Sequence, residues 1–184
     1  MQEINQLVKK CQEGNSQEFG GLYEMYFGKI YRFVYYKTMC KQIAEDLVSK
    51  TFLKAFENIG QFNADKGSFS AWIYRIARNN VIDYYRVQKK DIDISDIWDL
   101  KTHENIEIDV ENQEKIYELK ESIQELTPKQ REILILRIWD NLSYSEIAEI
   151  TGKTEENCRV IFSRTIRGLR KNVVVCLFAL SLTL

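Results

Sequence analysis

Residues 142–171 read LSYSEIAEITGKTEENCRVIFSRTIRGLRK, and their features occur in the order of a helix-turn-helix unit. Ser143 and Glu146 have the spacing of a capping box, so a short helix is predicted to begin there. Gly152 suits the left-handed conformation that ends a helix, and Thr154 suits the cap of the next one. Two short helices joined by such a turn are typical of units that bind the major groove of DNA.

The second of these helices is basic on one side. Residues three or four apart share a face of a helix. The predicted duplex-binding face consists of Asn157, Arg159, Val160, Ser163, Arg164, Arg167 and Lys171. Arginine can hydrogen-bond to O6 and N7 of guanine, and its neighbours can hold phosphates. The alternative interpretation is a solvated basic helix that only packs through its apolar side.

The composition indicates an all-α protein. The 184 residues are 45% hydrophobic with a single proline, and helical periodicity prevails over strand-like alternation. The net charge of −1 hides a segregation, because residues 91–114 hold nine acids and one lysine. This pattern predicts two small, basic helical domains joined by an acidic linker. The expected N-terminal domain spans residues 1–90 and the acidic linker spans 91–113. The expected C-terminal domain spans 114–172 and is followed by an apolar tail, 173–184.

Several classes of protein are not indicated. The four cysteines form no C-x-x-C pair and there is one histidine, so neither a metal site nor a cofactor is expected. The carboxylates outside the linker are scattered, so we expect no enzyme and no small-molecule substrate. The N-terminus lacks a signal peptide, which favours the cytoplasm. The apolar tail, 173–184, is shorter than the ~20 residues of a transmembrane segment. Either it covers a hydrophobic patch as a final helix or strand, or it docks on a partner.

The periodicity predicts three helices in the N-terminal domain and about four in the C-terminal domain. Apolar residues recur at helical spacing in 19–34, 43–59 and 69–86. A further helix is expected over 114–126. Thr127-Pro128-Lys129-Gln130 then has the pattern of another helix start, with a capping threonine and proline in the first turn.

The third predicted helix, FSAWIYRIARNNVIDYYR, combines arginines with aromatic residues. Such a surface suits single-stranded nucleic acid, because rings stack on unpaired bases while cations hold the backbone. Trp72, Tyr74, Tyr84 and Tyr85 are the candidate stacking residues, although Trp72 could equally belong to the core. The loop that joins Phe62 to this helix is polar, and it could receive an extruded base.

AEDLVSKTFLKAF, FSAWIYRIARNNVIDYYR, LTPKQREILILRIWDNLSYSEIAEITG and the basic helix follow one another along the chain. In this order they resemble the motifs of bacterial extracytoplasmic-function (ECF) sigma factors, over most of residues 19–171. The resemblance implies sigma region two, a linker and sigma region four. It also implies binding to core RNA polymerase and to promoter DNA, promoter-specific initiation, and control by an anti-sigma factor.

The resemblance also assigns residues to partners. The surface that grips polymerase is implied to contain Glu45, Asp46, Val48, Thr51 and Phe52. The melted non-template strand of the minus-ten element is implied to contact the 62–69 loop and the third helix, at Phe62, Asn63, Lys66, Phe69, Trp72, Tyr74, Arg75, Arg78, Asn79, Asp83 and Arg86. The last helix is implied to read the minus-thirty-five element as duplex. Ile161 and Ile166 stand where many relatives carry polar residues, so base preference is not transferred.

The energy of strand opening indicates a partner. At ~1.4 kcal/mol per stacking step, a bubble of about ten base pairs requires on the order of 14 kcal/mol. Two or three captured bases cannot offset this, so we expect opening only within RNA polymerase. The acidic linker either occupies a basic channel meant for RNA or is simply solvated. A stand-alone helix-turn-helix regulator is the alternative function.

Overall fold

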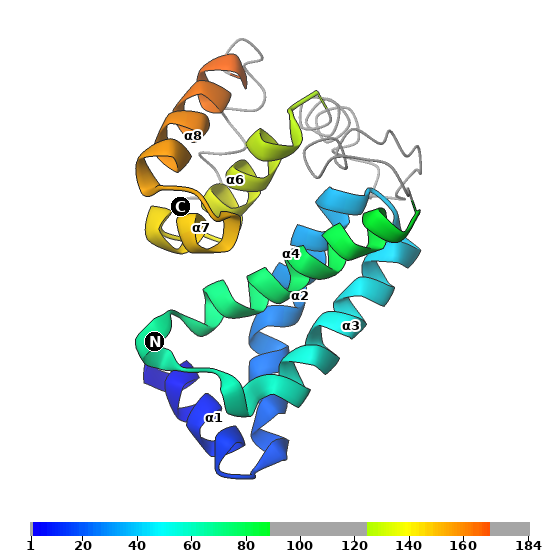
Figure 1. Ribbon diagram of the computed structural model, residues 1–184, viewed down its shortest axis with the longest axis vertical. Coiled ribbons are helices and arrows are strands. Elements are labelled where there is room, and N and C mark those ends of the chain that lie inside the picture. Colours follow the sequence, from blue (N-terminus) through cyan, green and yellow to red (C-terminus); the bar gives the residue numbers. More distant parts are fainter. Residues whose placement is uncertain (1, 89–124, 170–184) are drawn as a thin grey trace, which may run out of the picture.

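The computed structural model describes residues 2–88 and 125–169, and their regular elements are all helices. Figure 1 shows two bodies. The N-terminal body contains α1 (Gln2–Gln12), α2 (Phe19–Thr38), α3 (Lys41–Asn58) and α4 (Phe69–Gln88). The C-terminal body contains α6 (Pro128–Ile138), α7 (Tyr144–Thr151) and α8 (Glu155–Leu169). Single 3-10 turns occur at Ser16–Glu18, Ile59–Gln61 and Ala64–Lys66. The predicted all-α class is confirmed.

Some predicted features lie outside the described residues. These are the acidic linker, 91–113, most of the expected helix over 114–126, the end of the basic helix with Lys171, and the apolar tail, 173–184.

The N-terminal body is built on α2, α3 and α4, the three helices that the periodicity predicts. Their inward side chains form one core that includes Leu22, Ile30, Phe33, Ile73 and Tyr74, all fully buried. α2 runs without interruption through Gly20 and Gly21, although glycine is a poor helix former.

The sequence analysis missed α1, a short helix before the first predicted one. Its signal was the helical spacing of Ile4, Leu7, Val8 and Cys11, of which the last two are buried. α1 packs closely on α2 at Gly21. A Cβ atom added to this glycine would lie only 3.2 Å from the Leu7 side chain. The glycine that weakens α2 thus makes room for α1.

The predicted caps of the C-terminal body are confirmed. The backbone N–H of Glu146 donates to the Ser143 hydroxyl at 3.2 Å, and the Glu146 carboxylate accepts from the Ser143 N–H at 2.9 Å. Gly152 ends α7 in the left-handed region, with φ of 69°. The Thr154 hydroxyl accepts from the Asn157 N–H at 3.2 Å and caps α8. Local sequence therefore determines where α7 ends and α8 begins.

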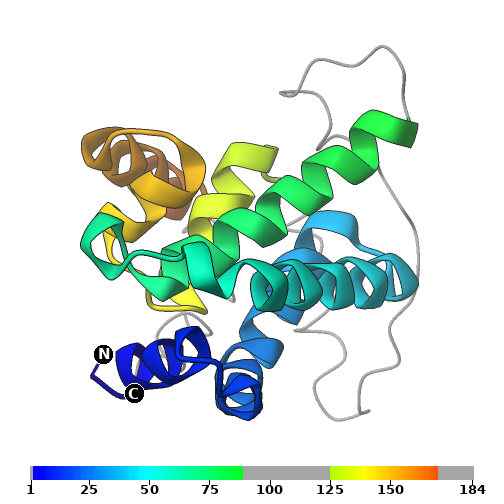
Figure 2. The same ribbon diagram turned by 60° about the horizontal axis from the view of Figure 1, so that its bottom comes forward.

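The two bodies pack against each other, with α7 beside α4 and α6 beside α2 (Figures 1 and 2). Tyr36 and Trp139 contact across this boundary, with ring centroids 5.7 Å apart. Of the described helices, none combines the length and the apolar composition that crossing a membrane requires. Within the same ranges, no cluster of histidine, cysteine and acidic side chains is suited to hold a metal ion.

We predict that Ser143→Ala lowers the free energy of unfolding by about 1 kcal/mol, the usual loss for a helix cap. Urea unfolding followed by circular dichroism measures this change. Ser163→Ala, on the exposed face of α8, is the control, and it should stay within about 0.5 kcal/mol. Equal effects of the two variants would contradict a capping role for Ser143.

Candidate nucleic-acid and polymerase interfaces

α8 presents its predicted duplex-binding face to solvent. Asn157, Arg159, Val160, Ser163, Arg164 and Arg167 are all exposed. The opposite side packs through Cys158, Thr165 and Leu169, which are buried. Arg159 lies over the Tyr144 ring, 4.7 Å from its centroid, and pairs loosely with Glu155 at 3.7 Å. The helix thus has one face for packing and one polar, basic face free for a ligand.

A cavity of about 330 Å³ opens between α3 and α4. It is lined by Lys54, Asn58, Gln61, Trp72, Ile76, Asn79 and Asn80. The Lys54 ammonium donates to the Asn80 carboxamide at 2.6 Å, and Asn80 donates to the Thr51 hydroxyl at 3.0 Å. An indole ring, an aliphatic side chain and several carboxamides are the groups that hold a flat, polar heterocycle.

The structure brings Trp72 and Asn79, two of the residues predicted to contact the melted strand, to this cavity. Trp72 is half-buried and leans on Phe62 and Phe69, with centroid distances of 5.4 and 5.6 Å. The sequence analysis missed the α3 side, including Lys54 and Asn58. Their signal was weak, because polar residues on an amphipathic helix normally face solvent.

Three of the aromatic residues expected to contact the melted strand are core residues instead. Phe62 and Phe69 are buried, and Tyr74 is fully buried with its ring edge-on to Phe33 at 5.1 Å. Burial and the nearby Asp140 carboxylate raise the pKa of the Tyr74 hydroxyl. Phe62 and Phe69 pack against Trp72, and the burial of all three rings leaves them no surface for a base. Helical periodicity does not distinguish a ring that packs from a ring that binds.

The polar residues expected to bind the melted strand are divided between two surroundings. Those exposed to solvent are Asn63, Lys66, Arg75, Asn79, Asp83 and Arg86. The Asn63 side chain accepts from the Asp65 N–H at 2.8 Å and so shapes the loop. Arg75 and Arg78 make ion pairs with the C-terminal body, at 2.8 and 3.1 Å.

The predicted polymerase surface on α3 is smaller than expected. Glu45 and Asp46 are exposed, but Val48, Thr51 and Phe52 are buried. The Thr51 hydroxyl donates to the backbone of its own helix at 2.7 Å. These three residues therefore position α3, and of the five predicted residues only Glu45 and Asp46 are exposed to a partner.

Exposed apolar side chains on α2 and α3 were missed by the sequence analysis. The Tyr23 ring lies 4.7 Å from that of Phe52, and Phe27 follows at 5.2 Å from Tyr23. Tyr23, Phe27, Leu53 and Phe56 are all exposed. We name these four residues the aromatic patch. An apolar group of this kind on a protein surface is typical of a site for another protein.

Comparison with known proteins identifies the family. Residues 22–91 match Sigma-70 region 2, and residues 116–167 match Sigma-70 region 4. The ECF RNA polymerase sigma factor SigM of Bacillus subtilis (strain 168) is 33% identical over 150 residues, covering 81% of this chain and 91% of SigM. The chain belongs to the ECF RNA polymerase sigma factors. Sigma factors are subunits for transcription initiation and are not enzymes.

A second relative extends the similarity to most of this sigma factor. The ECF sigma factor BldN of Streptomyces coelicolor is 32% identical over 172 residues, which are 90% of this chain but only 64% of BldN. The fold is similar to that of CnrH, solved in complex with the cytosolic domain of CnrY. That match has a TM-score of 0.68 at 19% identity and covers 91% of this chain and 94% of CnrH.

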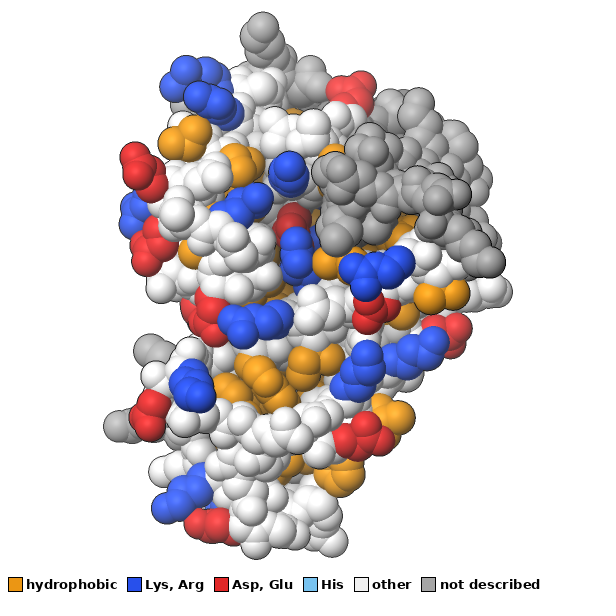
Figure 3. Space-filling view, in the orientation of Figure 1, with side chains coloured by type: hydrophobic (Ala, Val, Ile, Leu, Met, Phe, Trp, Pro, Cys, Tyr) orange, Lys and Arg blue, Asp and Glu red, His pale blue; other side chains and the backbone are white. Residues whose placement is uncertain are grey.

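The sigma factor also has buried acidic side chains at the boundary between the two bodies, which the sequence analysis missed. Glu132 on α6 is 4% exposed and accepts from Lys37 at 2.6 Å and from Arg78 at 3.1 Å. Asp140, at the end of the same segment, accepts from Arg32 at 3.2 Å. Figure 3 shows basic and acidic side chains side by side along the boundary between the two bodies.

Burial determines the titration of the Lys37 and Glu132 pair. Desolvation lowers the pKa of Lys37 to about 8, although the Glu132 carboxylate favours the charged form. Arg78 from α4 and Arg131 from α6 also face Lys37 and lower its pKa further. The pKa of Glu132 is lowered, because attraction to Lys37 and Arg78 exceeds the opposing effect of desolvation. The carboxylate is thus held charged between two cations.

We predict a specific pH dependence of stability from Lys37. Its pKa is about 8 in the folded chain against an ordinary 10.5, so the unfolded chain binds more protons between these values. Stability then rises with pH across this window. The free energy of unfolding of the native chain minus that of Lys37→Met should be level below about pH 8 and increase from there to about pH 10.5.

Denaturant titrations at several pH values measure this difference. Lys50→Met removes an exposed lysine from α3 and controls for the loss of one charge. A difference that stays level through the window for Lys37→Met would contradict a depressed pKa.

Proposed function

We propose that this sigma factor, bound to core RNA polymerase, recognises promoters with two surfaces. The exposed face of α8 reads the minus-thirty-five element as duplex. The cavity between α3 and α4 captures a base of the melted non-template strand at the minus-ten element. The observation that carries the proposal is this cavity, open beside Trp72 and Asn79 and lined by carboxamides and an indole.

The chemistry of the cavity favours a base that has left the helical stack. Its volume of about 330 Å³ is at the lower end of the ~300–1,000 Å³ of ligand pockets. Carboxamides offer both donors and acceptors to the edge of a base, and an indole offers a face for stacking. Such a pocket binds only an unstacked base, so it shifts the equilibrium towards the open promoter.

The exposed face of α8 suits a different form of DNA. α7 and α8 have the two-helix geometry in which the second helix enters the major groove. Arg164 and Arg167 lie on this face without a packing role, since Thr165 and Leu169 hold the helix to the body. The shapes of the two surfaces thus support duplex DNA as the ligand of α8 and the melted strand as the ligand of the cavity.

The aromatic patch with Glu45 and Asp46 is the proposed docking surface for core RNA polymerase. Exposed rings beside two acids favour a partner surface that is apolar and basic. We also infer, from membership of the family, that an anti-sigma factor binds this sigma factor and that the sigma factor works in the cytoplasm.

Run-off transcription from genomic fragments tests the proposed function directly. Core RNA polymerase is assayed with and without the sigma factor, and start sites that depend on its addition are mapped. We expect such sites to share two upstream elements. An Asp46→Ala chain should give fewer products at limiting concentration, with Glu57→Ala on the same helix as the control. The absence of any dependent start site would overturn the proposal.

We predict that Arg164→Ala weakens binding to promoter duplex by about 1–3 kcal/mol and relaxes preference at one base pair. Binding selections on randomised minus-thirty-five duplexes give both quantities. Lys9→Ala, at an exposed position of α1, should change neither the affinity nor the base preference. If the loss is uniform over all sequences, Arg164 contacts a phosphate and not a base.

We predict that Asn79→Ala reduces the fraction of open promoter, because a base in the cavity loses a hydrogen bond. A hydrogen bond contributes about 0.5–1.5 kcal/mol, so the open fraction should fall roughly two- to tenfold. Permanganate reactivity of unpaired thymines in the holoenzyme complex measures it. Gln17→Ala, exposed and outside the cavity, is the control. An unchanged open fraction would remove Asn79 from the base site.

A further inference from the structure

The connection between α3 and α4 is held by a side chain of α1. Gln12, the last residue of α1, donates from its carboxamide to the Ile59 carbonyl at 3.0 Å and to the Phe62 carbonyl at 2.7 Å. Both bonds start from one nitrogen, which carries two N–H groups, so both of its donors are used. The bonds join positions 47 and 50 residues apart in the chain. We name these two hydrogen bonds the Gln12 brace.

The brace ends on backbone groups that α3 cannot satisfy by itself. The last carbonyls of a helix have no partner within the helix. Ile59 is the C-cap residue of α3, and Phe62 starts the following loop in an extended conformation. The Ile59 carbonyl also accepts from the Phe62 N–H at 3.1 Å, which closes the 3-10 turn between them. Gln12 therefore caps α3 from a distance and fixes the direction in which the chain leaves it.

α1 is seated firmly enough to serve as a fixed point. Val8 and Cys11 are buried in the core of the N-terminal body. The Lys10 ammonium donates to the Glu18 carboxylate at 3.2 Å, next to the start of α2. α1 packs on α2 and on the turn that follows α3 (Figure 1). It also precedes residue 22, where the match to Sigma-70 region 2 begins. The brace thus comes from a segment outside the matched part of the chain.

The braced turn forms one side of the cavity between α3 and α4. Asn58 and Gln61 both line the cavity, and they lie on either side of the Ile59 carbonyl in the chain. The Phe62 ring packs on the Trp72 indole, which also lines the cavity, with centroids 5.4 Å apart. A shift of this backbone would therefore move two carboxamides and the support of the indole together.

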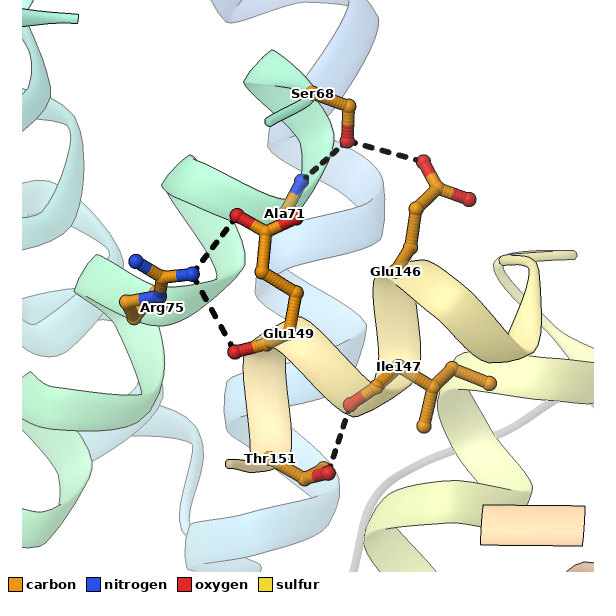
Figure 4. Close-up of polar contacts among 7 residues, drawn as sticks. All are labelled: Ser68, Ala71, Arg75, Glu146, Ile147, Glu149 and Thr151. Atoms are coloured by element: carbon orange, nitrogen blue, oxygen red, sulfur yellow. Dashed lines mark hydrogen bonds and ion pairs between the residues drawn. The ribbon is translucent and has the colours of Figure 1, made fainter. Parts of the chain in front are cut away.

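The other end of the loop is held at the start of α4. Figure 4 shows the Ser68 hydroxyl between the backbone of Ala71 and the carboxylate of Glu146. It accepts from the Ala71 N–H at 3.0 Å and donates to Glu146 at 3.1 Å. Asn63 and Lys66, between the two fixed ends, are exposed. A loop held at both ends has less conformational freedom to lose when a ligand binds.

We propose that Gln12 is a positioning residue for the base site, and that it holds the cavity in shape before melted DNA arrives. This inference rests on the proposed function, because it takes the ligand of the cavity to be a base of the melted strand. Gln12 is not among the residues that line the cavity. It acts through the backbone of the turn, and a preformed site binds more tightly because less ordering accompanies binding.

Hydrogen exchange in the isolated full-length chain tests the brace without polymerase. Gln12→Ala removes both donors, and Gln12→Glu keeps the size of the side chain but offers only acceptors. Gln17→Glu makes the same change of charge at another exposed glutamine and is the matched control. The Phe62 and Lys66 amides are bonded within the turn and the loop. In both Gln12 variants they should exchange about tenfold faster, the effect of losing one or two hydrogen bonds. The Met39 amide, at the end of α2, should be unaffected.

Permanganate reactivity in the holoenzyme, at saturating sigma factor, tests the effect on the base site. The open promoter fraction should fall roughly two- to tenfold in both Gln12 variants and stay unchanged in Gln17→Glu. A double-mutant cycle with Asn79→Ala separates positioning from general destabilisation. If Gln12 acts through the cavity, Gln12→Ala should reduce the open fraction less in the Asn79→Ala chain than in the native chain. Helical content by circular dichroism verifies that all chains are folded.

Each failure has its own signature. Unchanged exchange at Phe62 and Lys66 in both Gln12 variants would overturn the brace. Faster exchange with an unchanged open fraction would overturn its role in positioning, and so would strictly additive effects in the cycle. An open fraction unaffected by Asn79→Ala alone would count against the base site itself, and the exchange rates would still decide the brace. Failure of the inference thus remains distinguishable from failure of the proposed function.

Discussion

The arrangement of the two bodies depends on one buried carboxylate. Glu132 enters the boundary from α6 and meets Lys37 of α2 and Arg78 of α4 within 3.1 Å. A carboxylate in this position must stay charged, and both cations must be present, because any one of them left alone would be buried without a partner. The requirement fixes which faces of α2, α4 and α6 can meet.

The apolar core determines which side chains are left for binding. Phe69 and Tyr74 are buried in the core. The proposed binding surfaces therefore consist of side chains of α3 and α4 that remain exposed. On the α3–α4 side this remainder is the cavity beside Trp72. On α2 and α3 it is the aromatic patch. Both proposed binding surfaces therefore lie where helical packing is incomplete.

The surfaces proposed for DNA differ in how far they depend on tertiary contacts. α8 is positioned by its own cap at Thr154 and by a few buried residues, so its basic face is available in the structure as it stands. α4 shares its arginines with the acids of the C-terminal body. Arg75 pairs with Glu149 and Arg78 pairs with Glu132, so these cations join the two bodies. This sharing links the position of one body to the chemistry of the other.

Local chemistry let the sequence alone determine the helical class, the limits of α7 and α8, and the exposed basic face. Ser143, Gly152 and Thr154 act on backbone groups within four residues, so their effects can be read from spacing. Only the tertiary structure decided that Tyr74 is buried, which α3 residues line the cavity, and which cations pair with Glu132. These depend on residues far apart in the chain, such as Lys37 and Glu132, whose meeting no local pattern records.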